Sequence, residues 1–199
     1  MPPEPLTHPA IAWLQDPERL QAHIQETLQV RDDHPPLWED GHGIHGNLSV
    51  VFFLLGMQVP DTGSTPAPCL ILNKRSATVP QPGDICCPGG GIAPRFDRLA
   101  AQLLRLPLTP LRQWRGYRIV KRQAPQSLPR LSLLLATAMR EGLEEMRLNP
   151  LGIRFLGVLR PERLVMFRRI IYPMVGWVRR QQHFTPNGEV ARIVRIPLR

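Results

Sequence analysis

The sequence predicts a single α+β domain, and two kinds of segment carry that prediction. The first is a pair of strand-like runs, the apolar run 48–55 and the run 69–75, separated by a turn region rich in Pro, Gly, Ser and Thr. The second is a long helical stretch over 133–146. With 199 residues and 43% hydrophobic composition, the chain can bury one proper core, so we expect one domain over residues 1–199.

The N-terminal part, residues 1–47, is expected to be Pro-rich coil, then a helix, then a loop. Thr7 is the expected N-cap of that helix, whose apolar positions form an interrupted stripe. The loop carries His42 and His45 in a Gly-rich context, which is a weak pattern for metal ligation. We therefore expect this part to serve packing.

The two strand-like runs are expected to pair as a hairpin with a long connection. A loop over 76–88, punctuated by prolines and Gly83, then leads into the glycine turn Gly89-Gly90-Gly91.

The helix over 133–146 carries the most informative pattern, with Ser132 as its expected N-cap. Glu141, Glu144 and Glu145 fall within one arc of this helix, and Arg140 precedes Glu144 by one turn and can brace it. The opposite face is expected to pack through Leu135, Met139, Leu143 and Met146. Two readings stay open from spacing alone: a solvated face, or three carboxylates that suit a hard divalent cation such as Mg²⁺.

The composition of the chain limits which kinds of molecule it is expected to bind. The apolar run 48–56 is too short to span a bilayer and the N-terminus lacks a signal-peptide pattern, so we expect a cytoplasmic protein with no membrane partner. The three cysteines cannot all pair within the chain and lack zinc-ligand spacing, so we expect them reduced. The net charge of +9 reflects either a polyanionic partner or an arginine-rich proteome. Without aromatic residues interleaved among the basic ones, nucleic acid is not the expected partner.

The ordered pieces Arg75-Ser76, Gly83, Pro88-Gly89-Gly90, Thr137-Ala138-Met139-Arg140-Glu141 and Glu144-Glu145 resemble the Nudix hydrolases, in their coenzyme A pyrophosphatase-like branch. Later pieces are similar to that branch as well: Ile171–Gly176, Pro186–Val190 and Pro197-Leu198. The resemblance covers roughly residues 48–198. It implies the Nudix fold, an α/β/α sandwich around a mixed β-sheet.

The resemblance also implies an activity: Mg²⁺- or Mn²⁺-dependent hydrolysis of a pyrophosphate bond in a small nucleotide substrate, a nucleoside diphosphate derivative. The branch points to CoA or acyl-CoA, split into 3′,5′-ADP and 4′-phosphopantetheine. The alternative is a non-catalytic Nudix-like module that binds a nucleotide or a protein partner through a basic insertion.

Site residues follow from the same resemblance. Metal ligands would be Glu141, Glu144, Glu145 and the backbone of Gly90, and Glu144, Glu145 and Arg140 would be catalytic. Arg75, Gly89 and Gly90 would bind substrate, although Arg75 could instead brace the glutamate helix. Glu189 is the candidate general base, with a strand-edge or cap acid as its alternative role.

The sequence departs from the family pattern in the middle of the motif. Gly91, five residues and then Asp97 match its first half with Asp for Glu, but residues 98–139 stand before Arg140, where the family has a short link. We therefore expect an insertion over 98–131, with a short helix at 99–106 and a strand or arm at 114–122. Two interpretations of this insertion stay open. It is either a lid or a dimer arm, and a dimer arm would make the protein a homodimer, or it is a structural elaboration without a direct role. Arg147 also stands where the family has a helix-ending glycine.

Overall fold

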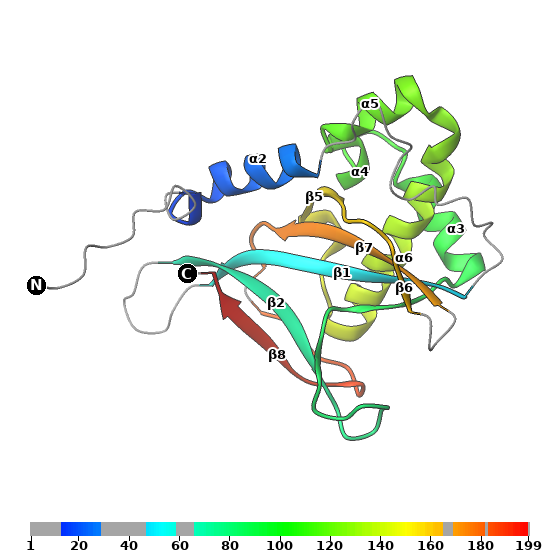
Figure 1. Cartoon of the computed structure of the whole chain (residues 1–199). Helices are drawn as coiled ribbons and strands as arrows, with labels where there is room; N and C mark the ends of the chain where they lie inside the picture. The colour runs from blue at the N-terminus through cyan, green and yellow to red at the C-terminus, as the bar shows by residue number, and fades with distance from the viewer. Residues whose placement is uncertain (1–12, 29–46, 59–65, 165–168, 182, 199) are drawn as a thin grey trace, which may run out of the picture.

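The structure is a computed structural model, and it describes residues 13–28, 47–58, 66–164, 169–181 and 183–198. A mixed sheet lies at its centre, with the order β3-β2-β1-β7-β5 and with β4, β6 and β8 pairing to β1, β7 and β2 (Figure 1). The strands are β1 Asn47–Gln58, β2 Ala67–Arg75, β3 Ile85–Cys86, β4 Gly89–Gly91, β5 Ile153–Val158, β6 Glu162–Leu164, β7 Arg169–Val178 and β8 Val190–Pro197. The pair β1–β7 is parallel and the other pairs are antiparallel. The predicted hairpin of β1 and β2 and the α+β class are confirmed.

Helices cover both faces of the sheet (Figure 1). They are α2 Pro17–Thr27, α3 Pro94–Leu103, α4 Pro110–Gln113, α5 Gly116–Gln123 and α6 Leu128–Met146, with short 3-10 turns at Pro125–Ser127 and Pro150–Gly152. Because side chains alternate along a strand, Val50 and Phe52 of β1 join the core beneath α6, whereas Leu55 packs with Leu20 of α2 on the other face. The result is three layers, with α2 on one side of the sheet and α3–α6 on the other. None of the helices within the described ranges combines the length and the apolarity that crossing a bilayer requires.

The first helix that lies wholly within the described residues is α2, which begins at Pro17. Asp16 caps α2, its Oδ1 accepting the amides of Glu18 and Arg19 at 3.0 and 3.2 Å. Thr7, the predicted cap, lies outside the described residues, as do His42 and His45.

The prediction of a strand or arm over 114–122 is wrong. Most of this range belongs to α5, which follows α4 after a two-residue turn, and the first helix of the region is α3, which begins at Pro94 instead of Leu99. Trp114 and Tyr117 are buried, and the indole Nε1 of Trp114 donates to the carbonyl of Leu156 at 3.0 Å. The physical reason is helical spacing, since Tyr117 and Val120 lie one turn apart and fill the same core.

Two details of the glutamate helix also differ from expectation. Helix α6 begins at Leu128, and Ser132 is a buried helix-interior residue whose hydroxyl donates to the carbonyl of Leu128 at 2.7 Å, so it is not the N-cap. Leu143, expected to be buried, is 40% exposed, because it lies at the edge of the apolar arc next to the last turn. Leu135, Met139 and Met146 are buried as predicted.

Arg147 ends α6 in the left-handed conformation that the family pattern assigns to glycine, with φ 55° and ψ 37°. Because this conformation is strained for a residue with a Cβ atom and natural for glycine, Arg147→Gly is expected to raise the free energy of unfolding by about 0.5 to 1 kcal/mol. Urea unfolding of the purified variant would measure the change. Arg147→Ala is the control, since it keeps the Cβ atom; an equal gain in both variants would contradict the argument.

Candidate active site

The glycine turn lies directly against the glutamate face of α6. Strand β4 pairs antiparallel with β1, with Gly90 opposite Val50, and the carbonyl of Pro88 accepts the amide of Phe52 at 2.8 Å. The amide of Gly89 donates to Oε1 of Glu145 at 3.3 Å. A Cβ atom on Gly90 would lie 2.3 Å from Oε1 of Glu141. A Cβ atom on Gly89 would lie 2.3 Å from the backbone carbonyl oxygen of Val50, so glycine is required at this position for the turn to pack against β1 beside the helix.

An ion pair joins the two halves of the motif, which are the segment from Gly91 to Asp97 and the helix segment that begins at Arg140. Nε of Arg140 lies 2.8 Å from Oδ1 of Asp97, whose side chain is completely buried. The same guanidinium donates to the carbonyl of Gly91 at 2.8 Å, and the hydroxyl of Thr137 donates to Asp97 at 2.9 Å. Residues 98–139 therefore leave and rejoin the site at one point, as the sequence requires if the motif is to form.

Arg140 also organises the carboxylates beside it. It pairs with Oε1 of Glu141 and with Oε2 of Glu144, each at 2.9 Å. Burial lowers the pKa of the Arg140 guanidinium, but the hydrogen bond with Asp97 and the charges of Glu141, Asp97 and Glu144 outweigh it and raise the pKa. The arginine is thus permanently charged. For Glu141, burial raises the carboxyl pKa, and the charge of Arg140 opposes this shift in part.

Glu145 is the most constrained carboxylate of the site. The side-chain amide of Asn73, on β2, donates a short hydrogen bond to Oε2, while the amide of Gly89 approaches Oε1. Burial raises the pKa of Glu145 to about 7; Glu141 and Glu189 add to the shift, and the two hydrogen bonds oppose it. Within the fold, this carboxylate is held in one orientation at an electrostatic cost.

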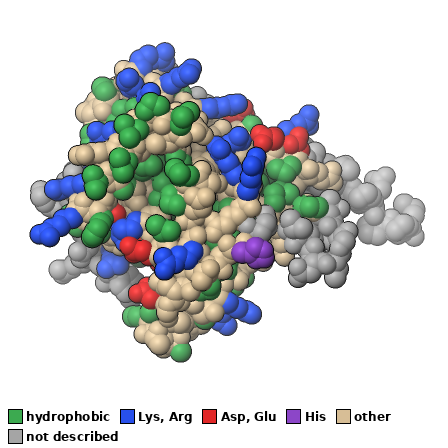
Figure 2. Space-filling view, turned by 180° about the vertical axis from the view of Figure 1, so that it is seen from behind, with side chains coloured by type: hydrophobic (Ala, Val, Ile, Leu, Met, Phe, Trp, Pro, Cys, Tyr) green, Lys and Arg blue, Asp and Glu red, His purple; other side chains and the backbone are tan. Residues whose placement is uncertain are grey.

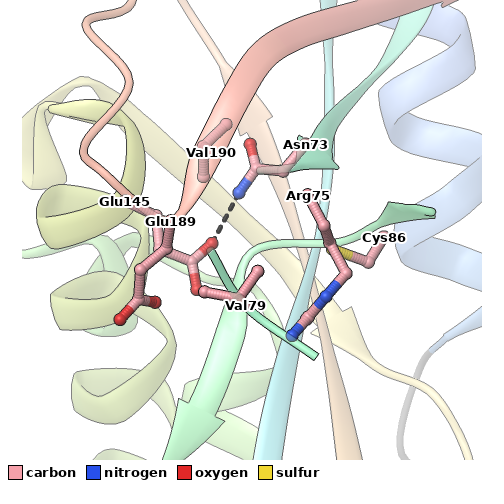
Figure 3. Close-up of a pocket in the computed structure, with 7 residues that line it drawn as sticks. All are labelled: Asn73, Arg75, Val79, Cys86, Glu145, Glu189 and Val190. Atoms are coloured by element: carbon pink, nitrogen blue, oxygen red, sulfur yellow. Dashed lines mark hydrogen bonds between the residues drawn. The ribbon is translucent and has the colours of Figure 1, made fainter. Parts of the chain in front are cut away.

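Glu189 lies next to Glu145 at the mouth of a small cavity. The cavity has a volume of about 20 Å³, which is room for about one water molecule. Glu145 and Glu189 lie on one side of it and Arg75 and Cys86 on the other (Figure 3). The remaining lining residues are Asn73, Val79 and Val190.

Backbone hydrogen bonds explain why Glu189 is found there. The amides of Thr185 and Asn187 donate to the carbonyls of Met146 and Glu145 at 3.1 and 3.0 Å, so the segment before β8 is attached to the C-terminal end of α6. The amide of Ser76 donates to the carbonyl of Glu189 at 2.9 Å, which attaches the end of β2 as well. Three segments distant in sequence thus meet around one cavity.

The structure brings together most of the sequence-predicted site residues. Gly89 contacts Glu145, Gly90 lies against Glu141, and Arg140 pairs with both Glu141 and Glu144. Arg75 and Glu189 line the adjoining cavity. Nε of Arg75 donates to the carbonyl of Pro80 at 2.7 Å.

One residue of this cluster was missed by sequence reasoning. Asn73 is 1% exposed and sits on the same face of β2 as the buried residues Cys69 and Ile71. A buried amide in an apolar strand is a signal that period-two alternation could have found.

The carboxylates of this site are of the residue type that binds a divalent cation. Among the described residues, no three Asp, Glu, His or Cys side chains already converge closely enough to hold one metal ion. Arg140 binds two of the three glutamates at present, but Glu144 is 54% exposed and its ion pair is of the weak surface kind. Carboxylates with a glycine carbonyl beside them are the ligands that Mg²⁺ and Mn²⁺ prefer, so the residue types fit such an ion.

Glu145→Gln is expected to stabilise the metal-free protein above pH 7 by about 1 to 2 kcal/mol, after allowing for solvent screening. The folded-state pKa of about 7 lies above the ordinary 4.5, so the wild type loses stability as pH rises between these values, whereas glutamine does not titrate. Urea unfolding at pH 5 and pH 8 tests this: the two proteins should differ little at pH 5 and clearly at pH 8. The same pH dependence in both would contradict it, and Glu26→Gln on the surface of α2 is the control.

The solved structures to which the chain is similar include several Nudix hydrolases. The chain is similar to a Nudix hydrolase from M. smegmatis, RenU, with 14% identity, a TM-score of 0.44 and coverage of 80% of this chain and 76% of that one. A Nudix hydrolase from Nitrosomonas europaea gives 13% identity and a TM-score of 0.45 over 78% of this chain, which spans 60% of that protein. The Nudix domain of Shewanella oneidensis NrtR, solved with ADP ribose, gives 15% identity and a TM-score of 0.43 over 80% of this chain and 77% of that one.

No protein-family model matches the sequence, and no curated protein matches it. The likeness to these solved structures concerns the arrangement of helices and strands.

Proposed function

We propose that this protein is a Nudix hydrolase that cleaves the pyrophosphate bond of a nucleoside diphosphate derivative. The observation that carries the proposal is the contact between the glycine turn and the glutamate face: the amide of Gly89 on Glu145, and the backbone of Gly90 against Glu141. Arg140 holds the helix and the turn together, since it forms an ion pair with Asp97 and donates a hydrogen bond to the carbonyl of Gly91. A merely solvated helix face would need neither a backbone amide donated to one of its carboxylates nor a fully buried aspartate paired with its arginine.

The proposed metal ligands are Glu141, Glu144 and Glu145 with the backbone of Gly90. When bound, Mg²⁺ or Mn²⁺ would neutralise charge on the phosphate oxygens and make a water molecule more acidic. Burial raises the pKa of Glu141 and Glu145, and neighbouring carboxylates add to both shifts, so a cation would relieve an existing electrostatic cost.

The chain's own residues supply orientation, proton transfer and anion binding. Asn73 and the Gly89 amide fix the Glu145 carboxylate, and the adjoining cavity has room for about one water molecule. We assign the general base to Glu189, whose exposed side chain lines that cavity from the segment that precedes β8. Arg75, across the cavity, is assigned to a phosphate oxygen of the substrate (Figure 3).

Within this reaction class, we propose CoA or acyl-CoA as the substrate, with 3′,5′-ADP and 4′-phosphopantetheine as products. The support is the resemblance of the sequence pieces that run from Arg75 to Leu198 to the coenzyme A pyrophosphatase-like branch. The strongly basic balance of the chain suits a substrate with an additional 3′ phosphate.

The test is turnover of a substrate panel with Mg²⁺ or Mn²⁺, resolved by chromatography and mass spectrometry: CoA, acyl-CoA, ADP-ribose, NADH and dinucleoside polyphosphates. CoA and acyl-CoA should give the two named products, and EDTA should abolish turnover. Hydrolysis of another panel member alone would overturn the substrate but keep the class. Thermal stabilisation by Mn²⁺ without any turnover would instead indicate a non-catalytic binding module.

A further inference from the structure

The positive charge of this protein is concentrated in one segment. Residues 98–131 contain eight of the 25 Lys and Arg residues and none of the 16 Asp and Glu residues, so the rest of the chain is nearly neutral. The eight are Arg98, Arg105, Arg112, Arg115, Arg118, Lys121, Arg122 and Arg130. Most of them are exposed. This segment runs from Arg98 in α3 through α4 and α5 into the first turn of α6, and its exposed side chains are strongly cationic.

The same region exposes an apolar surface. Phe96, Leu99 and Leu103 follow one another at helical spacing on α3 and are 75%, 61% and 55% exposed, while Asp97 and Ala101 on the opposite side are buried. The surface continues through Leu106 and Leu108 in the turn before α4. We call these five side chains the α3 apolar surface. Figure 2 shows the molecule from behind, with hydrophobic side chains interspersed among Lys and Arg.

Leu108 is the most exposed side chain of this surface, at 85%, and its backbone has a φ of 66°. That conformation favours glycine or asparagine, and a polar residue would suit a solvent-exposed turn better. Folding alone gives no reason for a leucine at this position. A contact between Leu108 and an apolar partner outside the molecule would explain it.

The combination of positive charge and exposed apolar side chains indicates which class of partner this surface binds. Arg95 and Arg98 border the apolar residues of α3, so the partner must offer negative charge beside an apolar phase. Nucleic acid offers no such phase for the leucines. In a two-fold symmetric contact, a second copy would bring two strongly cationic segments together. An anionic lipid bilayer offers both properties, since headgroup charge lies directly above the acyl chains.

We propose that α3 and the turn after it attach this protein to the surface of anionic lipid bilayers, with the α3 apolar surface inserted at the headgroup boundary. This attachment needs no spanning segment, so it is compatible with the helix lengths, although it replaces the expectation of no membrane partner. It is independent of the proposed function.

Docking would also place the candidate active site near the membrane. Helix α3 starts three residues after the glycine turn, and its buried face carries Asp97, which holds Arg140.

The experiment is co-sedimentation of the full chain with vesicles of phosphatidylcholine alone or with about 30 mol% phosphatidylglycerol. Binding is expected only to the anionic vesicles and should weaken steeply between low and high salt. Leu99→Ser/Leu103→Ser and, separately, Leu108→Ser should each reduce binding at least tenfold without changing the melting temperature. Leu151→Ser, at a 76% exposed leucine outside this surface, is the matched control and should bind as the wild type does.

Arginine variants test the charge component. Arg95→Gln/Arg98→Gln should reduce binding about fivefold for each arginine, whereas Arg160→Gln/Arg180→Gln, exposed elsewhere, should have a smaller effect. No binding to anionic vesicles at low salt would overturn the proposal. Binding that the leucine variants leave unchanged would also overturn it. So would tight RNA or DNA binding insensitive to Leu108→Ser, or a dimer in sedimentation velocity that Leu99→Ser/Leu103→Ser dissociates.

Discussion

Glu144→Gln is expected to lower kcat by at least about a hundredfold on the hydrolysed substrate, because it removes one of the proposed metal-binding carboxylates at the centre of charge development. Stability should hardly change. Glu144 is 54% exposed, and its ion pair with Arg140 is of the surface kind that contributes about 0 to 1 kcal/mol. Steady-state kinetics with Mn²⁺, together with a thermal unfolding curve, separates the two effects.

The control for this prediction is Glu26→Gln, an exposed glutamate of α2 on the far side of the sheet. It should keep full activity. A Glu144→Gln protein that retains wild-type kcat would remove Glu144 from the proposed site while leaving the reaction class standing.

Asp97→Asn is expected to lower the free energy of unfolding by about 3 kcal/mol or more, because it breaks a buried ion pair and leaves Arg140 partly uncompensated. Asp97 is fully buried and accepts hydrogen bonds from Arg140, from Thr137 and from the amide of Ala93, the last at 2.6 Å. For a chain of this size, the melting temperature should fall by roughly 6 to 12 °C. Differential scanning calorimetry measures it directly.

Asp84→Asn is the matched control, since Asp84 is an exposed aspartate of the loop after β2. Its melting temperature should stay within about 2 °C of the wild type. An Asp97→Asn protein as stable as the wild type would show that the contact of Asp97 with Arg140 does not hold the two halves of the motif together.

The parts of the fold that sequence could predict are those fixed by local periodicity. The strand over 48–55 follows from its continuous apolar run, and the glutamate face of α6 follows from helical spacing; both patterns depend on neighbouring residues only. The meeting of the glycine turn with that face followed from the family resemblance. Spacing along the chain could not show it, because Asp97 and Arg140 are 43 positions apart in the sequence.

The parts that sequence missed depend on tertiary contacts. Asn73 gains its role only because β2 lies beside Glu145. Residues 114–122 combine aromatic and β-branched residues with basic ones, and this composition locally favours a strand. The segment is helical instead, because a helix buries both Tyr117 and Val120 in the core. Ser132 has the type of an N-cap, but Leu128 and Pro129 extend the helix upstream of it.

The burial of Trp114 bears on how the protein unfolds. Leu111, Trp114, Tyr117 and Val120 belong to the same core as Phe52 and α6, and the Trp114 indole is hydrogen-bonded to β5. The segment between the two halves of the motif is thus part of one cooperative unfolding unit and is not a detachable appendage. Amide hydrogens of α5 and of the glutamate helix should exchange through the same global opening, so the carboxylate geometry survives only as long as the inserted helices stay folded.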